Sequence, residues 1–355
     1  ANVNYSGANL VGNSFTAAIP INSEALKFSL SINQTVYLFN TGTRDQWRKL
    51  NGSTVSGLVA GQYLTVPFNV AGQGDLPKMI PSTHAFMVMA DQASTLTIDY
   101  SKLVKNQTIT DSSGSQIATR SATSTSATAA TTTDATQKLP AIVMDVIGQG
   151  TADRVWIFSK ENTTYGFDSG WDGRKMADEG LTQLYVAATD SSRLQVATVP
   201  SMDKVAIGFI PATEGQYTLE FALSDELGKD EVYLNDLLTG NCRQIKNGES
   251  YAFEAKAGQP YNRFSLSYKA GSYTDEALID VNVTENGMIR ITNGSKKSCS
   301  VQVSSEKGVL LQRIEVKADG EAELKDIAPG TYVIRLQNAT LNDVRKIVLR
   351  KSLED

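Results

Sequence analysis

The stretch that decides the fold reads YTLEFAL, residues 217–223. Tyr217, Leu219, Phe221 and Leu223 are large and apolar, and smaller or polar residues separate them. Side chains two positions apart point to the same face of a β-strand, so this spacing predicts a strand with one buried face. The same period returns along the whole chain, at residues 28–32, 96–100, 264–268, 299–303 and 332–336.

Three further runs are apolar on both faces, at residues 36–39, 86–89 and 155–158. Such runs are typical of central strands in a sandwich. Long helical periodicity is absent, and Thr239-Gly240-Asn241 predicts a turn between strands at 232–234 and 244–245. The sequence therefore predicts an all-β protein made of tandem antiparallel β-sandwich domains of the jelly-roll or Ig-like kind.

One low-complexity segment divides the chain. Of the eighteen residues 119–136, sixteen are Ser, Thr or Ala, which have almost nothing to bury in a core. We expect a β-sandwich domain at 1–105, a linker or mobile loop at 106–137, and a second β-sandwich at 138–270. A second boundary near residues 270–272 leaves a small Ig-like β-sandwich at 274–355.

Composition excludes several classes of function. The net charge is −5 and no basic cluster is present, so nucleic acid is not an expected partner. No apolar run approaches the roughly 20 residues that span a bilayer, so no transmembrane segment is predicted in this chain. The chain opens with Ala1-Asn2-Val3 and shows no signal peptide, so we expect a processed or excised segment whose export signal or anchor lies outside it.

The reactive side chains are few. The single histidine, His84, precedes the apolar run at 86–89 and is interpreted as a structural residue at a strand entrance. Cys242 and Cys299 are interpreted as small semi-buried hydrophobes in different domains, with a bridge between domains or a reactive thiol as the alternatives. We therefore expect no catalytic, cofactor-binding or metal-binding residues, and a protein that is not an enzyme.

The most site-like segment is FDSGWDG, residues 167–173. Asp168 and Asp172 could help to coordinate Ca²⁺, which prefers oxygen ligands, although the spacing is not that of an EF-hand. The favoured alternative is a turn in which both carboxylates bond loop amides and the glycines adopt positive φ. Phe167 and Trp171 then anchor the turn to the core. The sequence leaves calcium binding open.

Exposed aromatic rings could bind carbohydrate by stacking. Trp156 lies in an apolar run and is assigned to the core, whereas Trp47 lies in a polar segment and is the best exposed candidate. Packing of Trp47 on its own domain is the alternative. The remaining candidates of this kind are Tyr63, Trp171 and Tyr273.

Several spaced motifs carry a family resemblance. DRVWIF at 153–158, GFDSGWDGRKM at 166–176, VYLNDLLTG at 232–240 and NRFSL at 262–266 resemble a β-sandwich module near the C-termini of large secreted and cell-surface proteins of Bacteroidetes. LVGNSF at 10–15 and VYLFN at 36–40 are similar to a partner module of those proteins. APGTYVIR at 328–335 and RKIVLRK at 345–351 resemble the tail read as a sorting domain by type IX secretion systems, without its opening P-N-P motif.

The resemblance implies a non-catalytic structural or adhesion module of a larger bacterial surface protein. Its location would be extracellular, at the cell surface and associated with the outer membrane. The partners it implies are other surface proteins or host and environmental glycans. The alternative is a carbohydrate-binding accessory region of a secreted glycan-active or proteolytic enzyme, with Trp47 or loop aromatics on the sugar.

Overall fold

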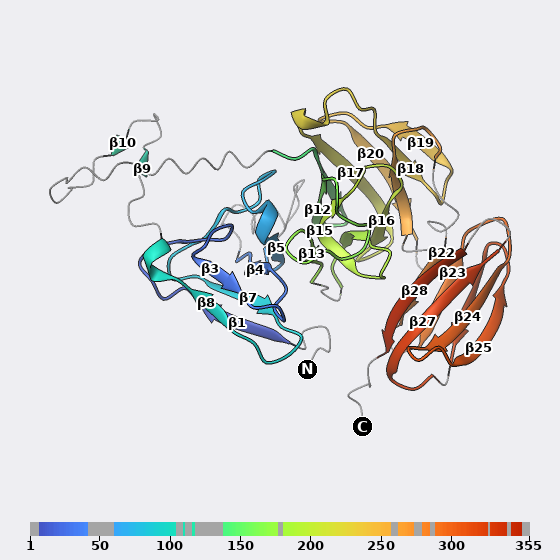
Figure 1. Ribbon diagram of the computed structural model, residues 1–355. Coiled ribbons are helices and arrows are strands. Elements are labelled where there is room, and N and C mark those ends of the chain that lie inside the picture. The colour runs from blue at the N-terminus through green and yellow to red at the C-terminus, as the bar shows by residue number, and fades with distance from the viewer. Residues whose placement is uncertain are drawn as a thin grey trace.

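The computed structural model describes residues 7–41, 60–103, 109–110, 116–117, 138–176, 180–256, 262–272, 279–284, 288–325, 327–338 and 342–349. In these residues the regular structure is β-strand plus three short 3-10 helices, with no α-helix, as the sequence alternation predicts (Figure 1). No helix in this part of the chain is long and apolar enough to cross a membrane.

The first unit centres on a four-stranded antiparallel sheet in the order β1-β7-β4-β5. Two short pairs, β2 with β6 and β3 with β8, complete its core, which contains Val36, Val66 and Phe86. The elements are β1 (Ala8–Gly12), β2 (Ile19–Pro20), β3 (Leu26–Phe28), β4 (Thr35–Phe39), β5 (Tyr63–Pro67), β6 (Met79–Ile80), β7 (Ala85–Met89), β8 (Leu96–Ile98), and the 3-10 helices Phe68–Val70 and Tyr100–Lys102.

Two of the predicted strands in this unit are shorter than the alternation suggested. The strand predicted at 28–32 ends at Phe28, and Leu30 is fully exposed in a turn. The strand predicted at 96–100 gives way to a 3-10 helix at Tyr100. Of the predicted linker, the structure describes only two short strands, which pair with each other: β9 (Ile109–Thr110) and β10 (Gln116–Ile117).

The second unit is one large sheet in the order β19-β18-β21-β16-β14-β15-β12-β11-β17-β20, with β13 added to β15. All pairs are antiparallel except β12 with β15, which run parallel. The strands are β11 (Ala141–Gly148), β12 (Thr151–Ser159), β13 (Gly173–Arg174), β14 (Gln183–Ala187), β15 (Arg193–Val199), β16 (Val205–Ile210), β17 (Gly215–Leu223), β18 (Tyr233–Asp236), β19 (Asn241–Gln244), β20 (Ser250–Ala255) and β21 (Asn262–Ser267).

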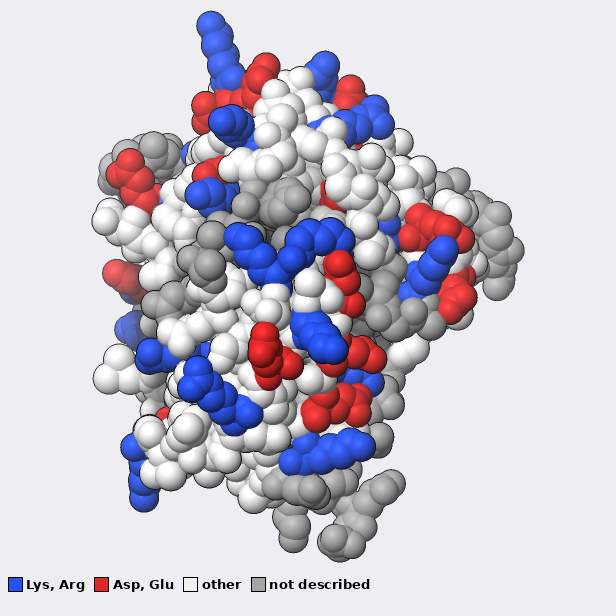
Figure 2. Space-filling model, turned by 90° about the vertical axis from the view of Figure 1, so that its right-hand side faces the viewer, with Lys and Arg blue, Asp and Glu red and all other residues white. Residues whose placement is uncertain are grey.

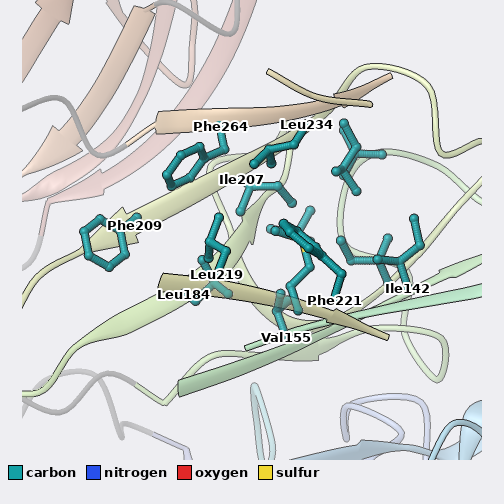
Figure 3. Packing of buried hydrophobic residues seen from close by; sticks show 14 of the residues in the cluster. Ile142, Val155, Leu184, Ile207, Phe209, Leu219, Phe221, Leu234 and Phe264 are labelled. Carbon is teal, nitrogen blue, oxygen red and sulfur yellow. The ribbon is translucent and has the colours of Figure 1, made fainter. Parts of the chain in front are cut away.

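This sheet folds over its own core. Phe209 on β16 lies 5.2 Å from Tyr217 on β17 and 5.0 Å from Phe253 on β20, measured between ring centroids, although β16 is far from both strands in the sheet order. The side chains labelled in Figure 3 converge from strands on both sides of this core. The second unit therefore has the two facing layers of a sandwich.

The third unit has two antiparallel sheets around a separate core that includes Cys299, Ile334 and Leu336. One sheet has the order β22-β23-β26 and the other β25-β24-β27-β28. The strands are β22 (Ile279–Val283), β23 (Ile289–Asn293), β24 (Cys299–Ser305), β25 (Leu310–Val316), β26 (Gly320–Leu324), β27 (Gly330–Gln337) and β28 (Asn342–Leu349).

Acidic and basic side chains are interspersed over the face of the molecule shown in Figure 2. That face offers no broad positive area of the kind that binds a polyanion.

Candidate functional site at the junction of the first two units

The first unit packs directly on the second, and the loop that the sequence singled out lies in this contact. In that loop, Asp172 is fully buried. Its Oδ2 accepts a hydrogen bond from the Asp168 amide at 2.7 Å, and its Oδ1 accepts one from the Thr198 amide at 2.6 Å. Asp168 Oδ2 accepts from the Thr164 amide at 2.6 Å. Both carboxylates thus bond backbone amides, and Gly170 has a φ of 83°.

The outer side of this loop docks on strands β4 and β5 of the first unit. Thr35 Oγ1 donates to the Asp172 carbonyl at 2.9 Å, and the Gly170 carbonyl accepts from the Asn69 amide at 2.9 Å. A Cβ at Gly173 would lie 2.0 Å from Thr65 Cγ2, so only glycine allows this approach. The motif therefore holds two units together.

A second loop crosses in the opposite direction, from the first unit to β12. Asp75 Oδ1 accepts from Trp156 Nε1 at 2.6 Å, and its Oδ2 pairs with the Arg154 guanidinium at 2.7 Å. A Cβ at Gly74 would lie 3.3 Å from the Phe158 ring. Arg154 also pairs with Asp145, so one arginine ties both units to one another.

Gln195 on β15 completes the edge of the first sheet. Its Oε1 accepts from the Thr65 amide at 2.8 Å, and its Nε2 donates to the Tyr63 carbonyl at 3.2 Å. One side-chain amide thus occupies a donor and an acceptor on the outer edge of β5, as a neighbouring strand would. Unpaired sheet edges invite association with other chains, and the second unit covers this one.

Apolar side chains fill the junction between these polar contacts. One cluster joins Val70 and Leu76 of the first unit to Trp156, Phe158 and Val196 of the second. A smaller cluster joins Tyr37 and Met87 to Met176. Burial raises the pKa of Tyr37 to about 12, so its hydroxyl stays neutral here.

An open recess of 330 Å³ lies at one side of the junction. Arg154 and Asp75, which form part of its walls, are already paired with each other. The lining residues are Leu38, Phe39, Asn40, Leu64, Asp75, Arg154 and Trp156.

The three carbohydrate candidates that the structure describes do not form an exposed platform. Trp156 is 2% exposed, as predicted for a core residue, and Trp171 is half-buried against the same cluster. Tyr63 is also half-buried, with its ring 5.1 Å from Phe39. Trp47 and Tyr273 lie outside the described residues.

The candidate reactive residues lie apart from one another. His84 is exposed just before β7, and its Nδ1 lies 3.1 Å from the Ser82 carbonyl, in keeping with a residue at a strand entrance. The semi-buried prediction is wrong for both cysteines, because Cys299 is fully buried and Cys242 is exposed on the edge strand β19. The two thiols are not bonded to each other, so the bridge between domains is not formed.

The charged residues of the recognised motifs form buried ion pairs. Asp153 of DRVWIF pairs with Lys175 of GFDSGWDGRKM, and these side chains are 0% and 3% exposed. Asp236 of VYLNDLLTG pairs with Arg263 of NRFSL at 3.0 Å, with 0% and 2% exposed. Segments far apart in the sequence are thereby locked together, a role that spacing alone did not reveal.

Among the described residues, no group of three or more His, Cys, Asp or Glu side chains could hold a metal ion. Because the carboxylates of Asp168 and Asp172 already accept amide hydrogen bonds, we expect millimolar Ca²⁺ or excess EDTA to shift the melting temperature by less than about 1 °C. Differential scanning fluorimetry checks this. A rise of several degrees with Ca²⁺ that Asp168→Asn removes would contradict it.

Burial raises the pKa of Asp172 to about 7, against its ordinary value of 3.8. The folded state then holds a proton that the unfolded state releases between these values, so this residue's contribution to stability falls as pH rises from about 4 to about 7. We expect Asp172→Asn to flatten that part of the stability–pH curve in urea unfolding. The exposed Asp230→Asn, an acidic residue of the same unit that is not among the groups acting on Asp172, is the control and should leave the slope unchanged. An unaltered slope in Asp172→Asn contradicts the assignment.

Residues 1–268 match the family model described as "Domain of unknown function (DUF8693)". The chain belongs to this family. One DUF8693 match therefore covers both units of the junction.

A curated relative is "Minor fimbrium subunit Mfa5" of Porphyromonas gingivalis, a surface protein of the Bacteroidetes, which is 49% identical over 352 residues. The match covers 98% of this chain but 28% of the relative, so the chain spans less than a third of that protein. A solved structure titled "Biofilm associated protein - BSP domain" aligns over 93% of this chain and 59% of its own, with 11% identity and a TM-score of 0.21. So low a score carries no conclusion.

Proposed function

We propose that this chain is a non-catalytic structural or adhesion module of a larger bacterial cell-surface protein, and that it works within a fimbrial assembly. The observation that carries the proposal is the 49% identity, over nearly the whole chain, to a protein named as a minor fimbrium subunit. Because the chain spans only 28% of that relative, the proposed role is that of one region of a longer subunit.

The geometry of the chain supports a structural role. The motif residues that looked most like a site are engaged in holding the fold: Asp153 and Asp236 are buried in ion pairs, and Asp172 accepts amide hydrogen bonds. A binding or catalytic site needs polar groups that are available to a ligand. These groups are instead committed to neighbours within the chain.

We also propose the division into domains at 1–105, 138–270 and 274–355, with residues 106–137 between the first two. Three separate groups of strands, each with its own main core, support it. The proposed partners are other proteins of the surface assembly, and the proposed location is the extracellular side of the outer membrane.

For the third unit we propose a sorting role of the type IX kind. The β27–β28 hairpin pairs without a register shift from Gly330–Leu349 to Gln337–Asn342, and it contains residues 330–335 and 345–349 of the two sequence pieces of that resemblance. Removal of residues 274–355 from the full-length protein tests this. The truncated protein should accumulate in the periplasm, and unchanged export to the surface would contradict the sorting role while leaving the fimbrial proposal intact.

Immunogold electron microscopy of intact cells tests the main proposal. Antibodies raised against this chain should label fimbriae or the cell surface, and a deletion strain should lose the label and adhere less. Label that appears only after the cells are permeabilised would contradict it. If the purified chain turned over any member of a panel of glycosides, esters and peptides, the proposal that it is non-catalytic would be contradicted, while the fimbrial role would not.

A further inference from the structure

We infer that the contact between the first and second units holds without the segment that joins them, so that a chain cut within residues 119–136 stays one particle made of two pieces. The surface of the second unit around β13, β15 and the 168–174 loop is then a binding surface whose partner is the first unit itself. This inference does not depend on the fimbrial proposal.

The first support is that the polar contacts come from three separate places and run in both directions. The 168–174 loop reaches the first unit at Thr35 and Asn69, and Asp75 of the first unit reaches Arg154 and Trp156 of the second. The Gln195 side chain caps the edge of β5. A contact fixed at three points has one orientation and cannot hinge about a single loop.

The second support is the apolar surface that separation would uncover. Trp156 is 2% exposed, and Phe158, Val70 and Val196 are 0% exposed, and all four lie in the cluster shared by the two units. Returning such surface to water costs about 25 cal/mol per Å². A soluble unit rarely leaves a contiguous apolar patch of this kind uncovered.

The third support is where the contacts lie in the sequence. Every contact described above between the two units joins residues 34–87 to residues 139–196, so none uses the Ser/Thr/Ala run. The second unit is also fastened where it begins, because the Leu139 amide donates to Gln73 Oε1 at 2.9 Å. The contacts described here therefore do not need a covalent connection through residues 119–136, whose effect on them is to raise the effective concentration of one unit at the other.

The functional consequence concerns processing of the chain. At the cell-surface location proposed above the chain would meet proteases, and segments rich in small polar residues are preferred sites of proteolytic cutting. Cleavage there would leave the first unit in place and would create two new chain ends. Shedding of the first unit would require the junction itself to open.

A cleavable version of the full chain tests the inference. Part of residues 119–136 is replaced, at equal length, by the recognition sequence of a specific protease. After complete cleavage, size-exclusion chromatography with light scattering is run at about 1 μM. We expect a single peak with the mass of the uncut protein that contains both pieces on a denaturing gel. Two peaks with the masses of the separate pieces would overturn the inference.

Two variants of the cleavable chain locate the contact. Asp75→Ala removes the acceptor of Trp156 and the partner of Arg154 across the junction, and we expect the dissociation constant of the pieces to rise at least about tenfold. Asp91→Ala, an exposed acidic residue of the same unit that is not part of the junction, is the matched control and should leave it unchanged. Equal effects of the two variants would show that the pieces associate elsewhere and would overturn the assignment of the surface.

Discussion

Replacing Asp236 by alanine is expected to lower the free energy of unfolding of the second unit by about 3–5 kcal/mol. The Asp236 carboxylate accepts from Arg263 Nε at 3.3 Å and from its Nη2 at 3.0 Å. Arg263 is 2% exposed, with its guanidinium carbon 4.4 Å from the centre of the Phe253 ring. Without Asp236, a guanidinium stays buried with no counter-charge from this site, and the Tyr251 hydroxyl loses its acceptor.

Urea unfolding followed by tryptophan fluorescence measures this loss, because Trp156 and Trp171 both lie in the second unit. Asp230→Ala is the matched control, since Asp230 is an exposed acidic residue of the same unit, and we expect it to change stability by less than about 0.5 kcal/mol. A similar small change for Asp236→Ala would mean that Arg263 reaches water or another anion when its partner is removed.

The second large effect is expected at the pair of Asp153 and Lys175. Asp153→Asn keeps an acceptor for the Leu184 amide but leaves the Lys175 ammonium, 3% exposed, without its anion. We expect a loss of about 3–5 kcal/mol. Lys175→Met should cost less, because burial already raises the pKa of Asp153, and the unpaired acid can take up a proton.

The double variant Asp153→Asn/Lys175→Met separates these charge effects from a general loss of packing. With both charges gone, no unpaired ion is buried, and more than half of the loss caused by Asp153→Asn should be recovered. Equilibrium unfolding of the wild type, both single variants and the double variant gives the coupling energy. Strict additivity of the two losses would contradict a specific pair.

The alternation of residues predicted the all-β class because it follows directly from strand geometry. Phe264 and Leu266 face the core of the second unit as their spacing predicts. Prediction of burial from side-chain alternation fails where a strand is short or where a neighbouring unit covers its outer face. Leu30 continues an apparent alternation but lies in a turn, and β15 is buried on both faces because the first unit covers one of them.

The junction could be predicted only in part. The glycine-rich 167–173 loop was noticed, and the expectation that its carboxylates bond loop amides is matched by the observed geometry. That the same loop docks on another unit depends on contacts more than 100 residues apart in the chain. No sequence pattern indicated the role of Gln195. A glutamine within a strand is expected to face solvent, and its partner, the edge of β5, is known only from the structure.

Hydrogen exchange of the intact chain tests most directly whether the first two units form one docked body. The amides of Thr65 and Asn69 bond to acceptors on the second unit, Gln195 Oε1 and the Gly170 carbonyl. If the junction is closed, both amides exchange as slowly as those in the core of β12. Exchange of these two amides at the rate of exposed loop amides, while β4 and β12 stay protected, would contradict a docked body.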